Sequence, residues 1–393
     1  MSIINDKQKI EELLSRGVDE IINKEDLRKK LESGKQLRIK LGIDPTSPNI
    51  HLGRSIPLLK LRDFQELGHQ VVFIIGDFTG TIGDTSDKNS ERPMLDEETV
   101  KNNIERYVEQ AGKIIDIDKC EIYYNSQWLD KINYRDLCKQ ADVFSINEFI
   151  SRDNIKRRLD AGTRVSLREV LYPLMQGYDS VEIKADVELG GTDQRFNLLA
   201  GRELQRFYGQ EPQNIITNPL VEGLDGRKMS SSWGNTVNLL DSAKDMFGKI
   251  MSLQDEYIIK YFYLITRLDI DIIKAYEKEL KDGANPRDHK ILLAKEIIKF
   301  YFSEEEANQQ ESNFISTFTK KEVPDEMPEI SPSAYDLINI LVESKLVDSK
   351  TNARRVIEQG GVKVNSEVVK DINFTVPAGA VVQKGKINFL KVK

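Results

Sequence analysis

The sequence is poor in cysteine and has no long hydrophobic run. Its 393 residues hold two cysteines, Cys120 and Cys138, which give neither a disulfide framework nor a zinc-site spacing. So few cysteines fit a reducing compartment, and we expect a cytoplasmic location. The apolar run at residues 71–75 is far shorter than a membrane span, and the charged N-terminus lacks a secretory signal. We therefore expect no membrane partner.

A P-loop is also missing, because no stretch reads Gly-x-x-x-x-Gly-Lys-Ser/Thr, and this disfavours a P-loop NTPase. The net charge is -7, so the whole molecule is not a generic binder of polyanions. The charge is uneven, because residues 333–393 hold ten Lys and Arg against six Asp and Glu. A basic tail on an acidic body fits a small nucleic-acid-binding domain, and it also fits an ordinary solvated surface.

Hydrophobic periodicity indicates an α/β protein with a helical second part. Apolar residues at helical spacing predict one or two helices over 5–34 and another over about 56–67, with helices throughout 240–305. Residues 304–332 are polar and contain three of the twelve prolines, which predicts a linker. Because strands and helices alternate in the front part, we expect βαβ units and a parallel sheet. The expected strands are 37–43, 71–75, 121–125, 183–189 and 214–221.

The segment 42–54 lies between the first of these strands and the following helix, and it ends in His-Leu-Gly-Arg. Phosphates favour such a place, because the free N–H groups and the dipole of a helix N-terminus attract anions. Gly53 permits close approach of a nucleotide, and His51 can donate a hydrogen bond to a phosphate oxygen. Arg54 can do the same with a permanent charge. A capped helix start with an incidental histidine would read the same way.

A second candidate is the polar loop at residues 226–232, which reads Gly-Arg-Lys-Met-Ser-Ser-Ser. Its Lys228 can offset charge on a triphosphate as pyrophosphate leaves. An exposed flexible loop without this role would have a similar sequence. The two segments together are far more specific than either alone. Their combination resembles the class I aminoacyl-tRNA synthetases, whose signatures are written HIGH and KMSKS. The resemblance implies a Rossmann-like domain that activates an amino acid with ATP.

A third set of residues points to the amino acid. Tyr172, Gln176 and Asp179 have the spacing i, i+4 and i+7, which puts them on one face of a helix. The phenol and amide oxygens suit an α-ammonium group, and the carboxylate suits a phenolic hydroxyl. A polar stripe on a surface helix is the plain alternative. The pattern Tyr-x-x-x-Gln-x-x-Asp, however, resembles the tyrosine pocket of bacterial-type tyrosyl-tRNA synthetases.

This resemblance implies roles for further positions. Stabilisation of the transferring phosphates is implied for His51, Thr46, Lys228, Lys88 and Arg92. Tyrosine binding is implied for Lys40, Asp84, Tyr172, Gln176, Asp179 and Gln194. ATP binding is implied for Asp44, Gly53, Arg54, Gly191, Asp193, Lys228, Met229, Ser230, Ser231 and Ser232. ATP enters as a substrate with Mg²⁺, and we expect no permanently bound cofactor and no metal site in the protein itself.

Three positions depart from the family's pattern. Arg54 replaces the second histidine of HIGH, and Ser231 replaces the second lysine of KMSKS. Lys40 stands where many bacterial tyrosyl enzymes have a tyrosine that touches the substrate hydroxyl. Two alternatives therefore stay open. One is a paralogue that activates tyrosine or a tyrosine analogue for a specialised pathway, and the other is a non-catalytic RNA-binding protein on the same fold.

The basic tail agrees with this assignment. Residues 349–365 resemble the S4-type RNA-binding domain, in which Lys350, Arg354 and Arg355 share a helix and can meet phosphates. Lys363 follows a Gly-Gly turn, and a small α+β module that binds nothing is the alternative. The resemblance implies a homodimer with tyrosine tRNA as partner. The expected domains are a Rossmann-like catalytic domain (1–237), an α-helical domain (238–325) and an α+β S4-like domain (333–393).

Overall fold

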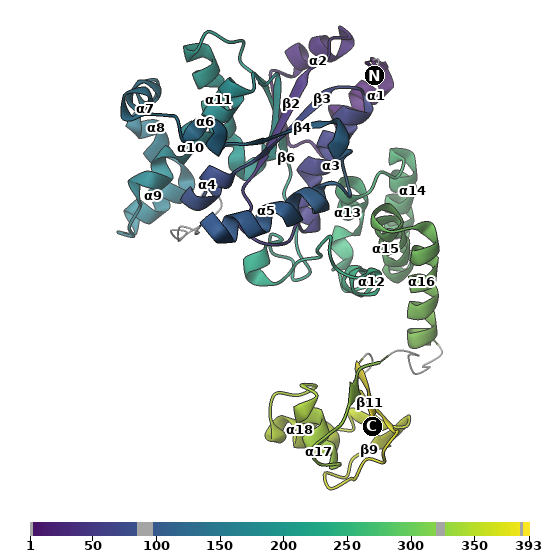
Figure 1. The fold of residues 1–393 in the computed structure, drawn as a ribbon. Coiled ribbons are helices and arrows are strands. Elements are labelled where there is room, and N and C mark those ends of the chain that lie inside the picture. Colours follow the sequence, from purple (N-terminus) through teal and green to yellow (C-terminus); the bar gives the residue numbers. More distant parts are fainter. Residues whose placement is uncertain (1–2, 85–96, 320–326, 386–387) are drawn as a thin grey trace. The chain divides into compact units, whose positions relative to one another are not determined.

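The chain forms two compact units, Met1–Ala307 and Asn308–Lys393, in a computed structural model that describes residues 3–84, 97–319, 327–385 and 388–393 (Figure 1). The Rossmann-like part expected over 1–237 lies in the first unit, together with residues 238–307 of the helical part expected over 238–325. The proposed boundary between them stays a prediction. None of the helices in the described part of the chain combines the length and apolar character needed to cross a membrane.

A six-stranded sheet with the order β1-β6-β5-β2-β3-β4 forms the centre of the first unit. Strands β2 to β6 are parallel, and the short β1 is antiparallel to β6. The strand order reverses between β2 and β5, where open α/β sheets bind ligands beyond the carboxyl ends of the strands. The strands are β1 (Glu20–Ile22), β2 (Arg38–Ile43), β3 (Gln70–Ile75), β4 (Cys120–Tyr124), β5 (Val187–Gly191) and β6 (Asn214–Asn218).

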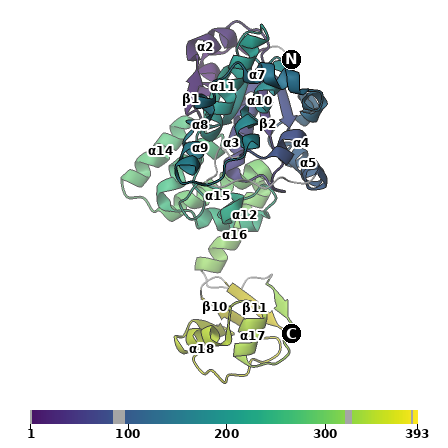
Figure 2. The ribbon, with the colours of Figure 1, turned by 90° about the vertical axis from the view of Figure 1, so that its left-hand side faces the viewer.

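Helices cover the sheet, and this explains why β3 is apolar along its length. Val72 and Ile74 pack against α6 and α10, while α3 packs on β2, β3 and β5. Figures 1 and 2 show α12, α14 and α15 gathered at one end of this unit and α2 at the other. The helices are α1 (Lys7–Leu13), α2 (Lys24–Glu32), α3 (Leu52–Glu66), α4 (Asp77–Ile82), α5 (Glu97–Ala111), α6 (Ser126–Leu129), α7 (Tyr134–Ala141), α8 (Ile146–Ile150), α9 (Asp153–Asp160), α10 (Leu167–Glu182), α11 (Arg195–Phe207), α12 (Ala243–Met251), α13 (Ile258–Ile265), α14 (Ile270–Lys281) and α15 (Pro286–Tyr301).

Helix and strand ends differ from the sequence prediction where local capping decides them. Helix α3 begins at Leu52 instead of about residue 56, because His51 is extended and caps it. The strand expected over 183–189 starts only at Val187, because Ile183 still closes α10 and Lys184 has a φ of 50°. The three-residue β1 was not predicted, because it is too short to show periodicity.

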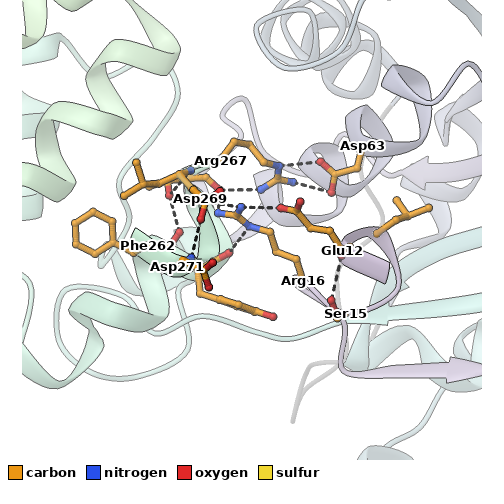
Figure 3. A network of polar contacts seen from close by, with 12 residues as sticks. Glu12, Ser15, Arg16, Asp63, Phe262, Arg267, Asp269 and Asp271 are labelled. Atoms are coloured by element: carbon orange, nitrogen blue, oxygen red, sulfur yellow. Dashed lines mark hydrogen bonds and ion pairs between the residues drawn. The ribbon is translucent and has the colours of Figure 1, made fainter. Parts of the chain in front are cut away.

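A polar network joins the N-terminal helix, α3 and the connection between α13 and α14 (Figure 3). The Arg16 guanidinium donates to the carbonyl oxygens of Thr266 and Leu268, both at 2.8 Å. Arg267 donates to both carboxylate oxygens of Asp63 on α3, at 2.8 and 3.2 Å. The helical part is therefore bound to the helix that begins with the His-Leu-Gly-Arg segment.

The linker predicted over 304–332 is wrong for its first half, where the chain forms α16 (Glu304–Thr319). The three prolines that suggested a linker, Pro324, Pro328 and Pro332, all follow this helix. The Ser303 hydroxyl accepts from the Glu306 amide at 3.1 Å, and acidic residues in the first turn favour the positive end of the helix dipole.

The second unit contains a five-stranded sheet with the order β7-β11-β10-β8-β9 and two helices packed against each other. It has an apolar core of its own, which includes Leu337, Ile340, Ile357 and Val382. The predicted α+β character is confirmed. The elements are β7 (Glu329–Ile330), α17 (Leu337–Glu343), α18 (Lys350–Glu358), β8 (Val362–Val364), β9 (Glu367–Val369), β10 (Val381–Lys384) and β11 (Asn388–Val392).

Candidate active site

His51 is a neutral hydrogen-bond donor at the start of α3. Its Nδ1 accepts from the Arg54 amide at 3.3 Å, so the single proton of the neutral ring belongs on Nε2. Burial, together with the nearby charges of Arg54 and Lys228, lowers the pKa of His51 to about 3. The ring therefore carries no charge at neutral pH. Among the described residues, Arg54 and Lys228 are the cations whose charges act on His51, and they can offer positive charge to a phosphate here.

The lowered pKa of His51 predicts acid sensitivity of folding. The unfolded histidine takes up a proton near its ordinary pKa of 6.5, but the folded one does so only near 3. The unfolded state binds more protons in this window, so the unfolding free energy falls as the pH falls, by about 1.4 kcal/mol per pH unit. We expect His51→Gln to flatten this slope in urea unfolding between pH 7 and pH 5. Equal slopes for both proteins would contradict the assignment.

The two signature segments lie side by side. The Leu52 amide donates to the Val237 carbonyl, and the Leu239 amide donates to the Ile50 carbonyl, both at 2.9 Å. The Gly53 amide donates to the sulfur of Met229 at 3.2 Å. A Cβ at residue 53 would lie 3.1 Å from the His51 ring, so any larger residue would crowd this turn and push against the ring. The structure thus brings the His-Leu-Gly-Arg turn and the Lys-Met-Ser-Ser-Ser loop together.

The lysine of the second signature reaches the end of β5. Its Nζ atom lies 2.9 Å from Oδ2 of Asp193, and Lys228 is about one-third exposed. A Cβ at Gly191 would lie 2.5 Å from Asp193 Oδ1, so a larger residue here would displace the Asp193 carboxylate. Met229 is buried and Ser230 half-buried, whereas Ser231 and Ser232 are exposed. The predicted ATP-binding groups on β5 and on the loop therefore meet beyond the carboxyl end of the sheet.

Helix α10 presents the predicted tyrosine-binding residues on one face and ties two of them to other elements. The Tyr172 hydroxyl donates to Asp44 Oδ2 at 2.7 Å. The Asp179 carboxylate accepts from the Trp128 indole N–H at 2.7 Å and from the Asn125 amide at 3.4 Å. Burial raises the pKa of Asp179 to about 7, against the opposing effects of Lys40, Trp128 and Asn125. Asp179 is thus a buried acceptor whose geometry is set from outside α10.

Trp128, Asn125 and Thr79 are site residues that the sequence reasoning missed. Thr79 donates to Asp44 at 2.7 Å and accepts from the Asn125 amide at 2.9 Å. These contacts connect the two ends of the predicted pocket. The sequence could have pointed to these residues. Asn125 ends a predicted strand and Trp128 follows it, and parallel α/β sheets bind ligands at this edge.

A chain of side-chain amides orients the groups expected to bind an ammonium. Gln176 donates to Glu188 at 3.2 Å, and its amide oxygen accepts from Asn197 at 3.1 Å. Asn197 also donates to Gln194 at 3.0 Å, and Gln194 donates to Asp84 at 2.7 Å. Because each donor meets an acceptor, both glutamine oxygens are fixed as acceptors, and each keeps a second lone pair for a ligand.

Lys40 lies inside the wall of the site. Its Nζ is 2.8 Å from Glu188 Oε1, 2.8 Å from Ser180 Oγ and 2.8 Å from the Gln176 carbonyl oxygen. The side chain has no exposed surface, so it borders no open space that a ligand enters. The direct contact with tyrosine that the resemblance implied stays a prediction. The observed arrangement gives Lys40 the task of neutralising Glu188 behind Gln176.

The buried Lys40–Glu188 pair predicts a stability effect. Lys40→Met leaves an unpaired buried carboxylate and is expected to lower the unfolding free energy by about 3–5 kcal/mol. Adding Glu188→Gln removes that charge and is expected to restore most of the loss. Urea unfolding measures both variants, with Lys244→Met on the exposed face of α12 as the control. A double variant that is less stable than Lys40→Met would contradict the pairing.

Several other predicted residues either fall outside the described part of the chain or belong to the second unit. Lys88 and Arg92 fall outside the residues that the structure describes. Lys350, Arg354 and Arg355 are exposed on α18 in the second unit, as the one-helix prediction required. The remaining predicted cation is the half-buried Lys363 of β8. The residues predicted to be catalytic and those predicted to bind RNA therefore belong to different compact units.

Comparison with known proteins agrees with this arrangement. The family model "tRNA synthetases class I (W and Y)" matches residues 31–319, and the S4 domain model matches residues 337–382. The tyrosine–tRNA ligase of Thermotoga maritima is 45% identical over 97% of this chain and 96% of its own length. That of Shewanella oneidensis is 48% identical over 96% of this chain and 97% of its own length.

Solved structures show the same fold. A C-terminally truncated mitochondrial tyrosyl-tRNA synthetase of Aspergillus nidulans has a TM-score of 0.67 at 21% identity, covering 80% of this chain and 95% of that one. The tyrosyl-tRNA synthetase of Archaeoglobus fulgidus, complexed with L-tyrosine, has a TM-score of 0.62 at 24% identity, covering 77% and 99%. The chain therefore belongs to the class I tRNA synthetases of the tryptophan and tyrosine group, and it carries a C-terminal S4 domain.

Proposed function

We propose that this protein is a tyrosine–tRNA ligase, which activates L-tyrosine with ATP and transfers the tyrosyl group to tRNA. One observation carries the proposal: both signature segments meet beyond the carboxyl end of the sheet, with the Gly53 amide bonded to Met229 and Lys228 paired with Asp193. The α10 face contacts the same edge, because Tyr172 donates to Asp44 after β2 and Asp179 accepts from Asn125 after β4. The relatives of similar length are named for the same activity.

Tyrosine recognition follows from the polarity of the pocket groups. Asp179 accepts from the phenolic hydroxyl, and its other donors, Trp128 and Asn125, hold the carboxylate in place. Phenylalanine would leave this buried acceptor without its ligand donor, which sites of this kind reject strongly. At the other end, Tyr172, Gln176 and Gln194 offer oxygen acceptors to the α-ammonium group, and Asp84 adds a carboxylate there.

In the activation step, the tyrosine carboxylate attacks the α-phosphorus of MgATP and pyrophosphate leaves. Catalysis of this kind rests on positioning and charge stabilisation. His51 donates through Nε2–H, Thr46 through its hydroxyl, and Arg54 and Lys228 supply positive charge. Lys88 and Arg92 are proposed to join them. Asp193, Asp44 and the loop residues Ser230, Ser231 and Ser232 hold the remainder of the nucleotide.

In the second step the tRNA 3′ end takes the tyrosyl group. We propose that the S4-like unit binds this tRNA through the exposed cations Lys350, Arg354 and Arg355, with Lys363 beside them. Binding through phosphates predicts strong salt dependence. The proposed domain limits are 1–237, 238–325 and 333–393, and the proposed location is the cytoplasm.

A homodimer is part of the proposal. The segment from α7 to the first residue of α10 exposes four large apolar side chains, and exposed apolar groups of this size mark interaction surfaces when they gather. These are Tyr134 (88% exposed), Ile146 (60%), Leu159 (46%) and Leu167 (68%). Sedimentation equilibrium of the full chain measures the assembly state, and a monomer at micromolar concentration would contradict this part.

Pyrophosphate exchange and tRNA charging test the function directly. We expect exchange between pyrophosphate and ATP that depends on tyrosine and not on phenylalanine, followed by charging of tyrosine tRNA. Exchange supported only by a modified tyrosine would indicate a specialised paralogue instead. RNA binding without exchange would indicate a non-catalytic relative on the same fold. Either outcome would overturn the proposal.

A further inference from the structure

Helix α5, to which no role was assigned, binds the backbone of the first signature segment. The Asn103 side chain donates to the Pro45 carbonyl at 2.8 Å. Gln110 donates to the Pro48 carbonyl at 3.1 Å and accepts from the Ile50 amide at 2.8 Å. A prolyl segment has few amide donors of its own for regular structure. Side chains of α5 therefore take the place of secondary-structure hydrogen bonds in this turn.

Between these two residues on the same helix face lies Tyr107, at spacing i+4 from Asn103. Its side chain is fully buried. Its hydroxyl accepts a hydrogen bond from Nη1 of Arg54 and lies 3.3 Å from Ser47 Oγ. The same guanidinium donates to Ser47 Oγ at 3.3 Å. A buried tyrosine hydroxyl needs a polar partner, and here that partner is the residue that departs from the family's HIGH signature.

The Nη1 edge of the Arg54 guanidinium is held by Tyr107 and Ser47, and its Nη2 edge faces Thr46. Among the described residues, Nη2 makes one long contact, 3.5 Å to the hydroxyl of Thr46, so hydrogens remain for a phosphate. An arginine is longer and has more rotamers than the histidine it replaces, and an unanchored arginine would lose more freedom on binding a ligand. The Tyr107 hydroxyl fixes the guanidinium before ATP arrives.

We propose that Tyr107 is a positioning residue for ATP, which acts by holding Arg54 in the conformation that receives the triphosphate. The inference rests on the proposed adenylating function and deepens it, because it assigns to α5 the support of the phosphate-binding turn. It also explains how arginine serves where the family has histidine. Tyr107 itself touches no substrate and acts only through Arg54.

Tyr107→Phe tests the inference, because it removes one hydroxyl and keeps the buried ring. In tyrosine-dependent pyrophosphate exchange we expect the KM for ATP to rise about fivefold to tenfold, as loss of one charge-assisted hydrogen bond implies. The KM for tyrosine should change less than about twofold, because the pocket at α10 is untouched. Tyr208→Phe is the control, since it removes a hydrogen bond to Gln140 at the far end of α11 and should leave both constants unchanged.

A double-variant comparison separates positioning from a purely structural role. In an Arg54→His background the Tyr107 hydroxyl keeps Ser47 but has lost the arginine that it positions, so Tyr107→Phe should add less than about twofold to the KM for ATP. If Tyr107→Phe raised the KM for ATP by the same factor with Arg54 in place and in the Arg54→His background, the two residues would act independently, and this would overturn the inference. So would an unchanged KM for ATP, or an equal rise for both substrates, in a variant with the wild-type melting temperature. Absence of exchange in the unmodified protein would instead contradict the proposed function.

Discussion

Replacing Asp179 with asparagine is expected to lower kcat/KM for tyrosine about 100-fold and to leave kcat/KM for phenylalanine within about threefold. The carboxylate is buried and already fixed by Trp128 at 2.7 Å and Asn125 at 3.4 Å. Its bond to the phenol is charge-assisted, and such bonds contribute about 1.5–3 kcal/mol. An amide keeps the shape of the side chain but loses the charge and one acceptor. Pyrophosphate exchange with both amino acids measures the ratio.

A pH profile adds a second readout for Asp179. Because burial raises the pKa of Asp179 to about 7, the accepting carboxylate form is lost as the pH falls through that value. We expect kcat/KM for tyrosine to rise with pH through about 7 in the unmodified enzyme and to stay flat in the asparagine variant. Glu182→Gln, an exposed carboxylate on the same helix, is the control. An unchanged tyrosine-to-phenylalanine ratio in Asp179→Asn would remove Asp179 from the specificity determinants.

Replacing Lys228 with alanine is expected to lower kcat for tyrosine activation about 100-fold to 1000-fold. Negative charge accumulates on pyrophosphate as it leaves, and His51 offers no positive charge there, because its pKa is lowered to about 3. Lys228 is part-exposed and paired with Asp193 at 2.9 Å, so the ammonium already lies at the nucleotide edge of the sheet. Rapid-quench measurement of tyrosyl-adenylate formation in a single turnover isolates this step from later ones.

Whether the Lys228→Ala variant loses activity through kcat or through KM identifies the role of Lys228. A group that acts as charge develops should reduce kcat and leave the KM for tyrosine within about twofold. Lys244→Ala, an exposed lysine on α12, removes an equal charge at a distance from the loop and should change neither constant. A kcat within about threefold of the unmodified enzyme would show that the loop lysine is dispensable for pyrophosphate release.

Local pattern was sufficient for the parts of the site that lie on one continuous stretch of chain. The i, i+4, i+7 spacing placed Tyr172, Gln176 and Asp179 on one helix face, because helical periodicity depends only on residue number. The apolar run at 71–75 became most of β3, since strands buried on both faces are apolar throughout, and the strand-like segment 37–43 became β2. The S4-like tail could be predicted in the same way, because its cations and its Gly-Gly turn lie within one short segment.

The linker was misread for a local reason as well. Polar residues over 304–319 were grouped with prolines that begin only at residue 324, and α16 formed where the prolines were absent. Glutamate, glutamine and alanine are good helix formers, so propensity should have outweighed polarity there.

The sequence by itself determined the family and predicted the adenylating chemistry and the amino-acid pocket, because each rests on short motifs whose geometry is local. Only the tertiary structure decided how these groups are held. The partners come from elements that are distant in sequence. Asp179 accepts from Trp128 and Asn125, Lys40 pairs with Glu188, and Arg54 donates to Tyr107. A buried polar group must find its partner wherever the packing puts one, and no periodicity in the chain announces that choice. Arg54 shows the difference most clearly, since the sequence marked it as a departure and the fold supplied the tyrosine that accommodates it.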